Sequence, residues 1–180
     1  DSGIDTAHEE FAGRLWVNDD AAGGGDNDSN GFVDDMNGWN FVTKSANIAD
    51  SSGHGTQVAG VAGAASNNAK GIAGICWQCR LMIVTAMQPS GAANYSDIAE
   101  AVKYASSNGA QVINISLGGY ADSQVLRDAI AEASVTALVV AGAGNDDSAS
   151  PFYPAAYAQV LAVAATDADD KKPVFSNYGQ

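Results

Sequence analysis

The chain has 180 residues, of which 46% are apolar and 16% charged, and its 8 Lys+Arg against 21 Asp+Glu give a net charge of −13. This balance excludes a disordered chain, which combines high charge with low hydrophobicity. The negative charge argues against nucleic acid and anionic membrane surfaces as partners, since both require basic residues. No apolar run reaches the roughly 18–20 residues of a membrane span. The length of 180 residues predicts a single globular domain.

The first half of the chain predicts two loops, one helix and one strand. Residues 18–38 are rich in Asp, Asn and Gly and predict a loop, and residues 44–53 predict a second one. From Gly53 onward small apolar residues cover nearly every face, which predicts a helix that is buried all round. Leu81–Met87 then has the composition of a strand.

The second half predicts alternating helices and strands. A helix is expected from an N-cap at Ser96 to a stop at Gly109, and another over Asp122–Ala133. The β-branched and apolar runs predict strands at 112–117, 137–141 and 160–164, the second covered on both faces. This alternation predicts an α/β fold with a central, mostly parallel sheet and helices on both faces. Ligands of such sheets bind beyond the carboxyl ends of the strands, which directs attention to residues 1 onward, 116–120 and 142–147.

Cys76 and Cys79 lie in the sequence Cys-Trp-Gln-Cys. A redox motif of this spacing would open a helix, whereas a predicted strand follows here, so we expect a structural pair, bonded or free. The chain begins without Met and stops at Gln180 with no closing element. Both ends therefore look truncated, and we expect an excerpt of a longer protein.

Three stretches at the strand ends carry residues that can do chemistry. Asp1 opens Asp-Ser-Gly-Ile, His54 lies in Gly-His-Gly-Thr-Gln-Val-Ala-Gly, and Asn145 ends Val-Ala-Gly-Ala-Gly-Asn. Taken singly, each has an ordinary structural explanation. Asp1 fits a turn, a histidine beside glycine often flanks a helix cap, and Gly-Asn is a common turn dipeptide.

Taken together and in this order, the stretches resemble the motifs of the subtilisin-like serine proteases, the subtilases. Asp-Ser-Gly-Ile resembles the family's aspartate motif, and the segment around His54 resembles its histidine motif. Residues 112–119, Val-Ile-Asn-Ile-Ser-Leu-Gly-Gly, resemble the substrate-binding segment, and Ala143-Gly144-Asn145 resembles the segment of the oxyanion-hole asparagine. The order of aspartate before histidine is also that of subtilisin. The resemblance extends over essentially the whole chain.

The resemblance implies a role for each residue of the three motifs. His54 would be the general base, Asp1 would orient it and stabilise its protonated form, and Asn145 would donate to the oxyanion. These roles require an Asp1 carboxylate oxygen within about 2.6–3.2 Å of a His54 ring nitrogen. His8 is expected elsewhere, as a surface or capping residue.

The sequence departs from the family pattern in one respect: it contains no Gly-Thr-Ser, the segment that holds the family's nucleophile. We therefore predict that residues 1–180 are part of the catalytic domain of a secreted, monomeric endopeptidase acting on proteins or peptides, and that this chain alone is inactive. The alternative is a non-catalytic homologue that binds calcium or peptides.

The resemblance also implies a substrate groove. Residues 116–118 would pair with the substrate backbone, and Ala143 and Gly144 would lie beside them. Gly91, Ala92 and Ala93 would form the opposite edge, with Tyr95 bordering a more distant apolar pocket, although Gly91–Ala93 also fit a plain turn. Small, uncharged residues predict broad specificity for apolar side chains. The residues of this groove are Ser116, Leu117, Gly118, Gly91, Ala92, Ala93, Tyr95, Ala143 and Gly144.

The acidic loop after residue 25 predicts a calcium site. Its oxygen-bearing residues follow the spacing of an EF-hand loop through the ninth position, but Asn37 stands where the bidentate Glu belongs, so it is not an EF-hand. A merely solvated acidic loop is the alternative. The expected ligands are Asp26, Asp28, Asn30, the Phe32 carbonyl, Asp34 and, as ligand or neighbour, Asp35.

The resemblance also implies a second calcium site. The segment 67–72 resembles the family's calcium loop after the histidine helix, with Asn68 as the side-chain ligand and Glu10 as the distant carboxylate. A glycine-terminated helix with asparagine caps explains the same residues.

Overall fold

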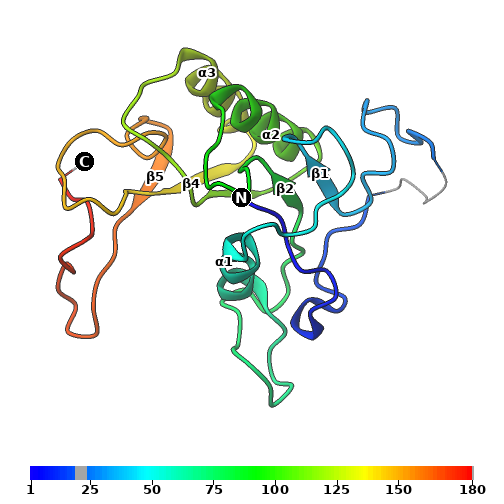
Figure 1. Cartoon of the computed structure of the whole chain (residues 1–180), viewed down its shortest axis with the longest axis horizontal. Helices are drawn as coiled ribbons and strands as arrows, with labels where there is room; N and C mark the ends of the chain where they lie inside the picture. The colour runs from blue at the N-terminus through cyan, green and yellow to red at the C-terminus, as the bar shows by residue number, and fades with distance from the viewer. Residues whose placement is uncertain (19–23, 180) are drawn as a thin grey trace. The chain divides into compact units, whose positions relative to one another are not determined.

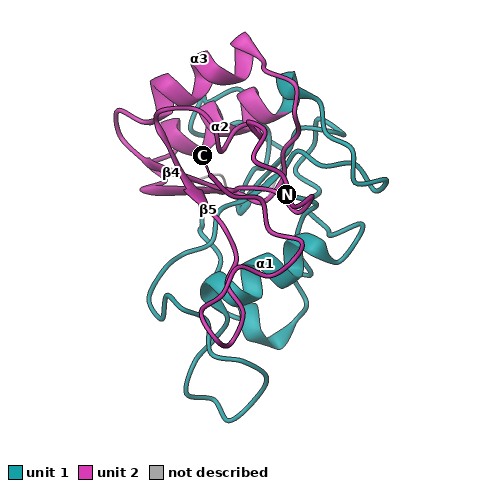
Figure 2. Ribbon diagram, turned by 90° about the vertical axis from the view of Figure 1, so that its left-hand side faces the viewer, with its two compact units in different colours: residues 1–97 teal, residues 98–180 magenta. Residues whose placement is uncertain are grey.

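The computed structural model describes residues 1–18 and 24–179. Its contacts divide the chain into two compact units, residues 1–97 and residues 98–180 (Figure 2). The strands are parallel within each unit, and helices alternate with them along the chain (Figure 1). The α/β class expected from the sequence is therefore confirmed.

The first unit contains a two-stranded parallel sheet. β1 (Gly38–Asn40) pairs with β2 (Ile83–Thr85), so that Trp39 lies opposite Val84. The sequence predicts a loop up to residue 38 and no strand at β1, because a strand of three residues is too short to establish an alternating pattern. This unit also contains the 3-10 helix η1 (Glu9–Phe11) and α1 (His54–Gly63). A core cluster of its buried apolar residues consists of Ile4, Phe11, Ile48 and Ile83.

The expectation that the helix after Gly53 is buried all round is wrong for the described chain. In α1 only Gly55 and Gly63 are buried, and Val61 is 59% exposed. Small apolar residues permit close packing on every side, but which sides are covered depends on the neighbouring elements. Here Ala59 packs on the core cluster while Val61 faces outward.

Cys76 and Cys79 form a disulfide bond, which agrees with the structural pair expected. The buried Arg14 guanidinium connects this loop to the end of α1. It donates to the carbonyl oxygens of Gly63, Trp77 and Cys76 at 2.9, 2.6 and 2.5 Å. Arg14 thus supplies a donor to the Gly63 carbonyl at the end of α1 and to two carbonyls of the disulfide loop.

The second unit is built on a three-stranded parallel sheet in the order β3-β4-β5. β3 (Val112–Ile115), β4 (Leu138–Gly142) and β5 (Val160–Val163) lie within the segments predicted as strands or within one residue of them. α3 (Gln124–Ala133) begins after Ser123, whose hydroxyl accepts from Leu126 N. α2 (Tyr95–Ser107) begins at Tyr95, so Ser96 is its second residue and not its N-cap.

One face of this sheet is covered and the other is open. α3 and the part of α2 in this unit lie on the same side of the strands (Figure 2). On that side Val139 is fully buried, whereas Leu138, on the opposite face, is 50% exposed. The expectation that 137–141 is covered on both faces is therefore wrong for the described chain, because an apolar composition does not specify which neighbour covers each face.

Candidate active site

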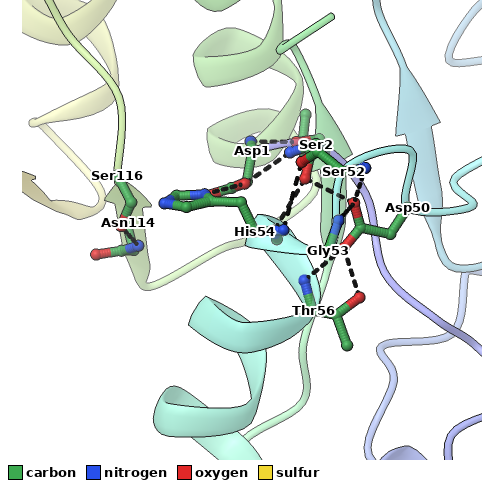
Figure 3. Close-up of polar contacts among 11 residues, drawn as sticks. Asp1, Ser2, Asp50, Ser52, Gly53, His54, Thr56, Asn114 and Ser116 are labelled. Atoms are coloured by element: carbon green, nitrogen blue, oxygen red, sulfur yellow. Dashed lines mark hydrogen bonds and ion pairs between the residues drawn. The ribbon is translucent and has the colours of Figure 1, made fainter. Parts of the chain in front are cut away.

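The N-terminus of α1 carries His54 and is held by side chains from outside the helix. Its cap residue, Gly53, has φ +86° and no side chain to offer. The first three helical N–H groups find other acceptors: His54 N donates to Ser52 Oγ at 3.3 Å, Gly55 N to Ser2 Oγ at 2.9 Å and Thr56 N to Asp50 Oδ2 at 2.8 Å (Figure 3). All three groups, which have no partner inside the helix, are therefore satisfied.

Asp50 is the centre of this network. Its Oδ1 accepts from Ser2 Oγ at 2.7 Å and from Ser52 N and Gly53 N at 3.0 Å. Its Oδ2 accepts from Thr56 Oγ1 at 2.5 Å as well as from Thr56 N. Burial disfavours the charged carboxylate, but the hydrogen bonds from Thr56, Ser2 and Ser52 outweigh that cost and hold the pKa of Asp50 well below its ordinary value.

The Asp50 network connects the residue after Asp1 to the helix that carries His54. Asp1 Oδ1 lies 2.8 Å from His54 Nδ1, within the range expected from the sequence, and it also accepts from Ser2 N at 2.7 Å (Figure 3). A Cβ on Gly55 would lie 2.2 Å from Gly3 O. The glycine after His54 is therefore required for the two segments to approach this closely.

We expect Asp50→Asn to destabilise the protein at neutral pH by about 1 kcal/mol, the usual effect of losing a helix-capping group. Because the folded pKa of Asp50 is depressed, its contribution is complete above the unfolded pKa of about 4 and is lost as the pH falls through the lower folded value. The stability difference between wild type and variant should therefore shrink below about pH 4. Urea unfolding between pH 7 and pH 2 measures it.

Asp5→Asn is the control for this titration. The Asp5 carboxylate accepts from Ala7 N, while Thr56 is contacted by the Asp5 backbone N–H, which the substitution leaves in place. A constant difference between wild type and Asp50→Asn across the whole pH range would contradict the role assigned to the ionised carboxylate.

Neither Asp50 nor Ser2 was identified as a functional residue from the sequence. The signal for Asp50 was its position four residues before His54, in a loop interpreted only as polar. No local pattern signals Ser2, because the N–H groups that it helps to satisfy lie more than 50 residues further along the chain.

The second unit presents Asn145 on the loop after β4. Ala143 N donates to Val163 O at 2.9 Å and extends the β4–β5 pairing by one bond. Gly144 follows at φ +106°, and Asn145 itself is exposed. In the part of the chain that the structure describes, the Asn145 side chain has no hydrogen-bond partner, so its amide is available to a ligand.

Two further segments were expected to contact substrate. Residues 116–118 follow β3, one of the two outer strands of its sheet, and Asn114 Nδ2 donates to Ser116 Oγ at 2.9 Å. In the first unit, Gly91 to Ala93 form a tight, largely exposed turn in which Gln88 N donates to Ala92 O at 2.8 Å, and Tyr95, half-buried, opens α2. The exposed turn at Gly91–Ala93 agrees with both interpretations of this segment, a groove edge and a plain turn.

The structure arranges the acidic loop around two amides. Asn30 Nδ2 lies 2.9 Å from Asp28 Oδ2 and 3.0 Å from Asp35 Oδ2, and Asn18 Nδ2 lies 3.0 Å from Asp28 Oδ2 and 2.6 Å from Asp35 Oδ1. Desolvation alone would raise the pKa of Asp28. Hydrogen bonds from Asn18 and Asn30 outweigh this effect, so the pKa of Asp28 lies below its ordinary value. Asp28 and the fully buried Asp35 therefore face the same pair of amides.

The other expected ligands of this loop have different contacts. The carboxylate of Asp26 accepts from Asn30 N and Gly31 N at 3.0 and 2.9 Å. Asp34 accepts from Gly24 N at 2.9 Å, and the Phe32 ring packs edge-on against Trp39. Within residues 1–18 and 24–179 no group of three or more His, Cys, Asp or Glu side chains is arranged to hold a metal ion.

Glu10 and Asn68 are brought together, as their assignment to one site requires. Asn68 Nδ2 donates to Glu10 Oε2 at 3.1 Å, and Glu10 is buried. α1 ends at Gly63, so Asn68 does not cap that helix; its Oδ1 accepts from Lys70 N at 3.1 Å instead. One carboxylate and one amide are too few to define a cation site. His8, as expected, caps a short helix: its Nδ1 accepts from Glu10 N at 3.3 Å.

Comparison with known proteins identifies the family. The model of the subtilase family matches residues 1–180, the whole chain. The chain therefore belongs to the subtilase family. None of the helices within residues 1–18 and 24–179 has the length and apolar composition of a membrane span.

Individual relatives agree with this assignment. The chain is 38% identical to the thermophilic serine proteinase of Bacillus sp. (strain AK1) and 34% identical to thermitase of Thermoactinomyces vulgaris, in each case over 99% of its own length. These matches cover 40% and 57% of the two relatives, so the chain spans about half the length of the proteins it resembles. The crystal structure of a cold adapted subtilisin-like serine proteinase superposes on 100% of this chain and 57% of its own, with a TM-score of 0.80 and 28% identity.

Proposed function

We propose that this chain is part of the catalytic domain of a subtilisin-like serine endopeptidase, supplying the aspartate, the histidine and the oxyanion donor, while the nucleophilic serine lies outside residues 1–180. The contact that carries the proposal is the 2.8 Å separation between Asp1 Oδ1 and His54 Nδ1. It joins residues 53 positions apart in the pairing that a triad requires.

In this proposal His54 acts as the general base. When Nδ1 carries the ring proton and forms a hydrogen bond to Asp1 Oδ1, Nε2 has a lone pair that can accept the serine proton as the hydroxyl attacks the peptide carbonyl. The negative charge of Asp1 then stabilises the imidazolium. His54 next returns the proton to the leaving amine, and the acyl-enzyme is hydrolysed by the same sequence with water as the nucleophile.

Asn145 would stabilise the charge that develops on the carbonyl oxygen. Its exposed amide can donate a hydrogen bond to the tetrahedral intermediate, and such a donor acts on the transition state more than on the ground state. Asn145 is therefore expected to influence kcat more than KM.

Labelling with a fluorophosphonate, a reagent for activated serines, tests the proposal. We expect covalent labelling of a chain extended through a downstream Gly-Thr-Ser segment, loss of labelling when that serine is changed to alanine, and no labelling of residues 1–180 alone. Labelling of a hydroxyl within residues 1–180 would show that the nucleophile has been misplaced. A folded extended chain that is not labelled would support the non-catalytic homologue instead.

The proposal extends to substrate and location. Protein or peptide substrates with apolar side chains fit the small, uncharged residues of the expected groove segments. The Cys76–Cys79 disulfide supports an oxidising compartment, and we include secretion to the extracellular space, as a monomer, in the proposal.

Calcium is the proposed cofactor of the acidic loop. The carboxylates of Asp28 and Asp35 face one another across the amides of Asn18 and Asn30. If the two amides turn so that oxygen replaces nitrogen, these side chains present only oxygen ligands, which suits a hard cation. Asp26, Asp34 and the Phe32 carbonyl complete the proposed set. Glu10 and Asn68, with backbone carbonyls of residues 67–72, would form the second proposed site. When bound, calcium would neutralise the repulsion between the carboxylates.

We expect chelation by EGTA to lower the melting temperature of the longer protein and to speed its self-digestion. A ligand that binds only the folded state at 100 times its Kd stabilises that state by about 2.7 kcal/mol. Asp28→Ala should remove most of the difference between calcium and EGTA, and the matched surface change Asp128→Ala, on α3, should not. Coincident melting curves with calcium and with EGTA would contradict the assignment.

A further inference from the structure

Asn177 lies near the end of the second unit and is fully buried, with 0% exposure. Its side-chain amide contacts the loop that carries Asn145. Nδ2 donates to Ala143 O at 2.9 Å, and Oδ1 accepts from Asp146 N at 2.9 Å and from Ser148 N at 3.0 Å. The partners lie on both sides of Asn145 in the sequence, so one side chain holds both ends of the segment that presents Asn145.

The hydrogen-bonding capacity of this amide is fully used. The second Nδ2 hydrogen faces Tyr120 Oη at 3.4 Å. The amide therefore donates two hydrogen bonds and accepts two, which is all that its two hydrogens and two lone pairs allow. Turning the amide over would place Nδ2 against the N–H groups of Asp146 and Ser148 and Oδ1 against Ala143 O. Both of these contacts would be repulsive in a buried position, so only the observed orientation of the amide is favourable.

The backbone of the loop is fitted to Asn177 at Gly144. Asn177 N donates to Gly144 O at 3.0 Å. Gly144 has φ +106°, and a Cβ at that position would lie 2.3 Å from Asn177 Nδ2. The residue immediately before Asn145 is therefore a glycine because any side chain there would displace the amide of Asn177.

We propose that Asn177 is a positioning residue for Asn145: by binding Ala143, Gly144, Asp146 and Ser148 it fixes the backbone from which the Asn145 amide reaches the oxyanion. The Asn145 side chain has no other support among the described residues, so its direction depends on this backbone. The inference rests on the proposed function, since it requires Asn145 to act as the oxyanion donor.

A double-mutant cycle in the active, serine-containing protein tests the proposal. Asn177→Asp keeps the shape and the acceptors for Asp146 and Ser148 but removes the donor to Ala143 O. We expect kcat to fall by about tenfold or more with KM nearly unchanged, a smaller effect than the ~10²–10³ of losing an oxyanion donor outright. In an Asn145→Ala background the same substitution should change kcat by less than about twofold, because the group that Asn177 positions is already absent.

Two controls separate positioning from general loss of structure. Asn108→Asp removes a comparable amide donor in the same unit, where Asn108 Nδ2 binds Tyr104 O at 3.0 Å, and should leave kcat unchanged. Active-site titration with the fluorophosphonate corrects every rate for unfolded protein. If Asn177→Asp does not fold, Gly144→Ala disturbs the same contact from the other side and should show the same dependence on Asn145.

The outcomes distinguish the two levels of inference. If Asn177→Asp lowers kcat by the same factor with and without Asn145, Asn177 acts through another group and the positioning role is overturned. An Asn145→Ala variant with normal kcat would instead refute the oxyanion role in the proposed function.

Discussion

Replacing His54 with alanine in the serine-containing protein should lower kcat by about 10⁶-fold, a magnitude known from subtilisin itself. The reason is that the serine hydroxyl then has no base to accept its proton, and the leaving amine has no acid. KM should change little, because the imidazole acts on the transition state and does not hold the ground-state substrate. Steady-state hydrolysis of a chromogenic peptide, normalised to folded protein, measures both constants.

The chain contains its own control for this experiment. His8 is its other histidine and caps the 3-10 helix η1 through the bond from Glu10 N. His8→Ala should therefore reduce stability by about 0.5–2 kcal/mol and leave kcat unchanged. Retention of more than about one hundredth of the activity in His54→Ala would contradict the role of His54 as the base.

The part of the site that the sequence could predict is the part carried by short motifs. The pairing of Asp1 with His54 follows from the resemblance of their two motifs to those of the subtilases, whose triad places an acid beside a base. Their supporting residues could not be found in the same way. Ser2 binds the helix at Gly55 and Asn177 binds the loop at Ala143, contacts across 53 and 34 residues that arise only when the chain folds.

The fold was predictable to a similar extent. The strands β3, β4 and β5 and the helix α3 follow from runs long enough to show a period. β1 has only three residues and does not. Burial was predicted least well, as Val61 and Leu138 illustrate, because apolar composition describes what a surface can bury and not which neighbour covers it.

Asp1→Asn should lower kcat by about 10⁴-fold, the order known for the aspartate of serine-protease triads, including that of subtilisin. The substitution removes the charge that stabilises the imidazolium while keeping the shape of the side chain. Its amide has two possible orientations. In one, Oδ1 keeps its bonds with Ser2 N and His54, and Nδ2 takes the place of Oδ2, a buried atom with no hydrogen-bond partner in the described chain. In the other, Nδ2 donates to His54 Nδ1.

The second orientation forces the His54 proton onto Nε2, the nitrogen that must accept the proton of the serine, so the base is blocked as well as less stabilised. Proton and nitrogen NMR of the His54 ring distinguishes the two orientations, because only the first retains a proton on Nδ1. Asp5→Asn removes an equal charge four residues further along, where the carboxylate accepts from Ala7 N at 3.0 Å, and should leave both kcat and the ring spectrum unchanged. If Asp1→Asn stays within about tenfold of the wild-type kcat, the 2.8 Å contact between Asp1 and His54 is structural, and the catalytic assignment of Asp1 is wrong.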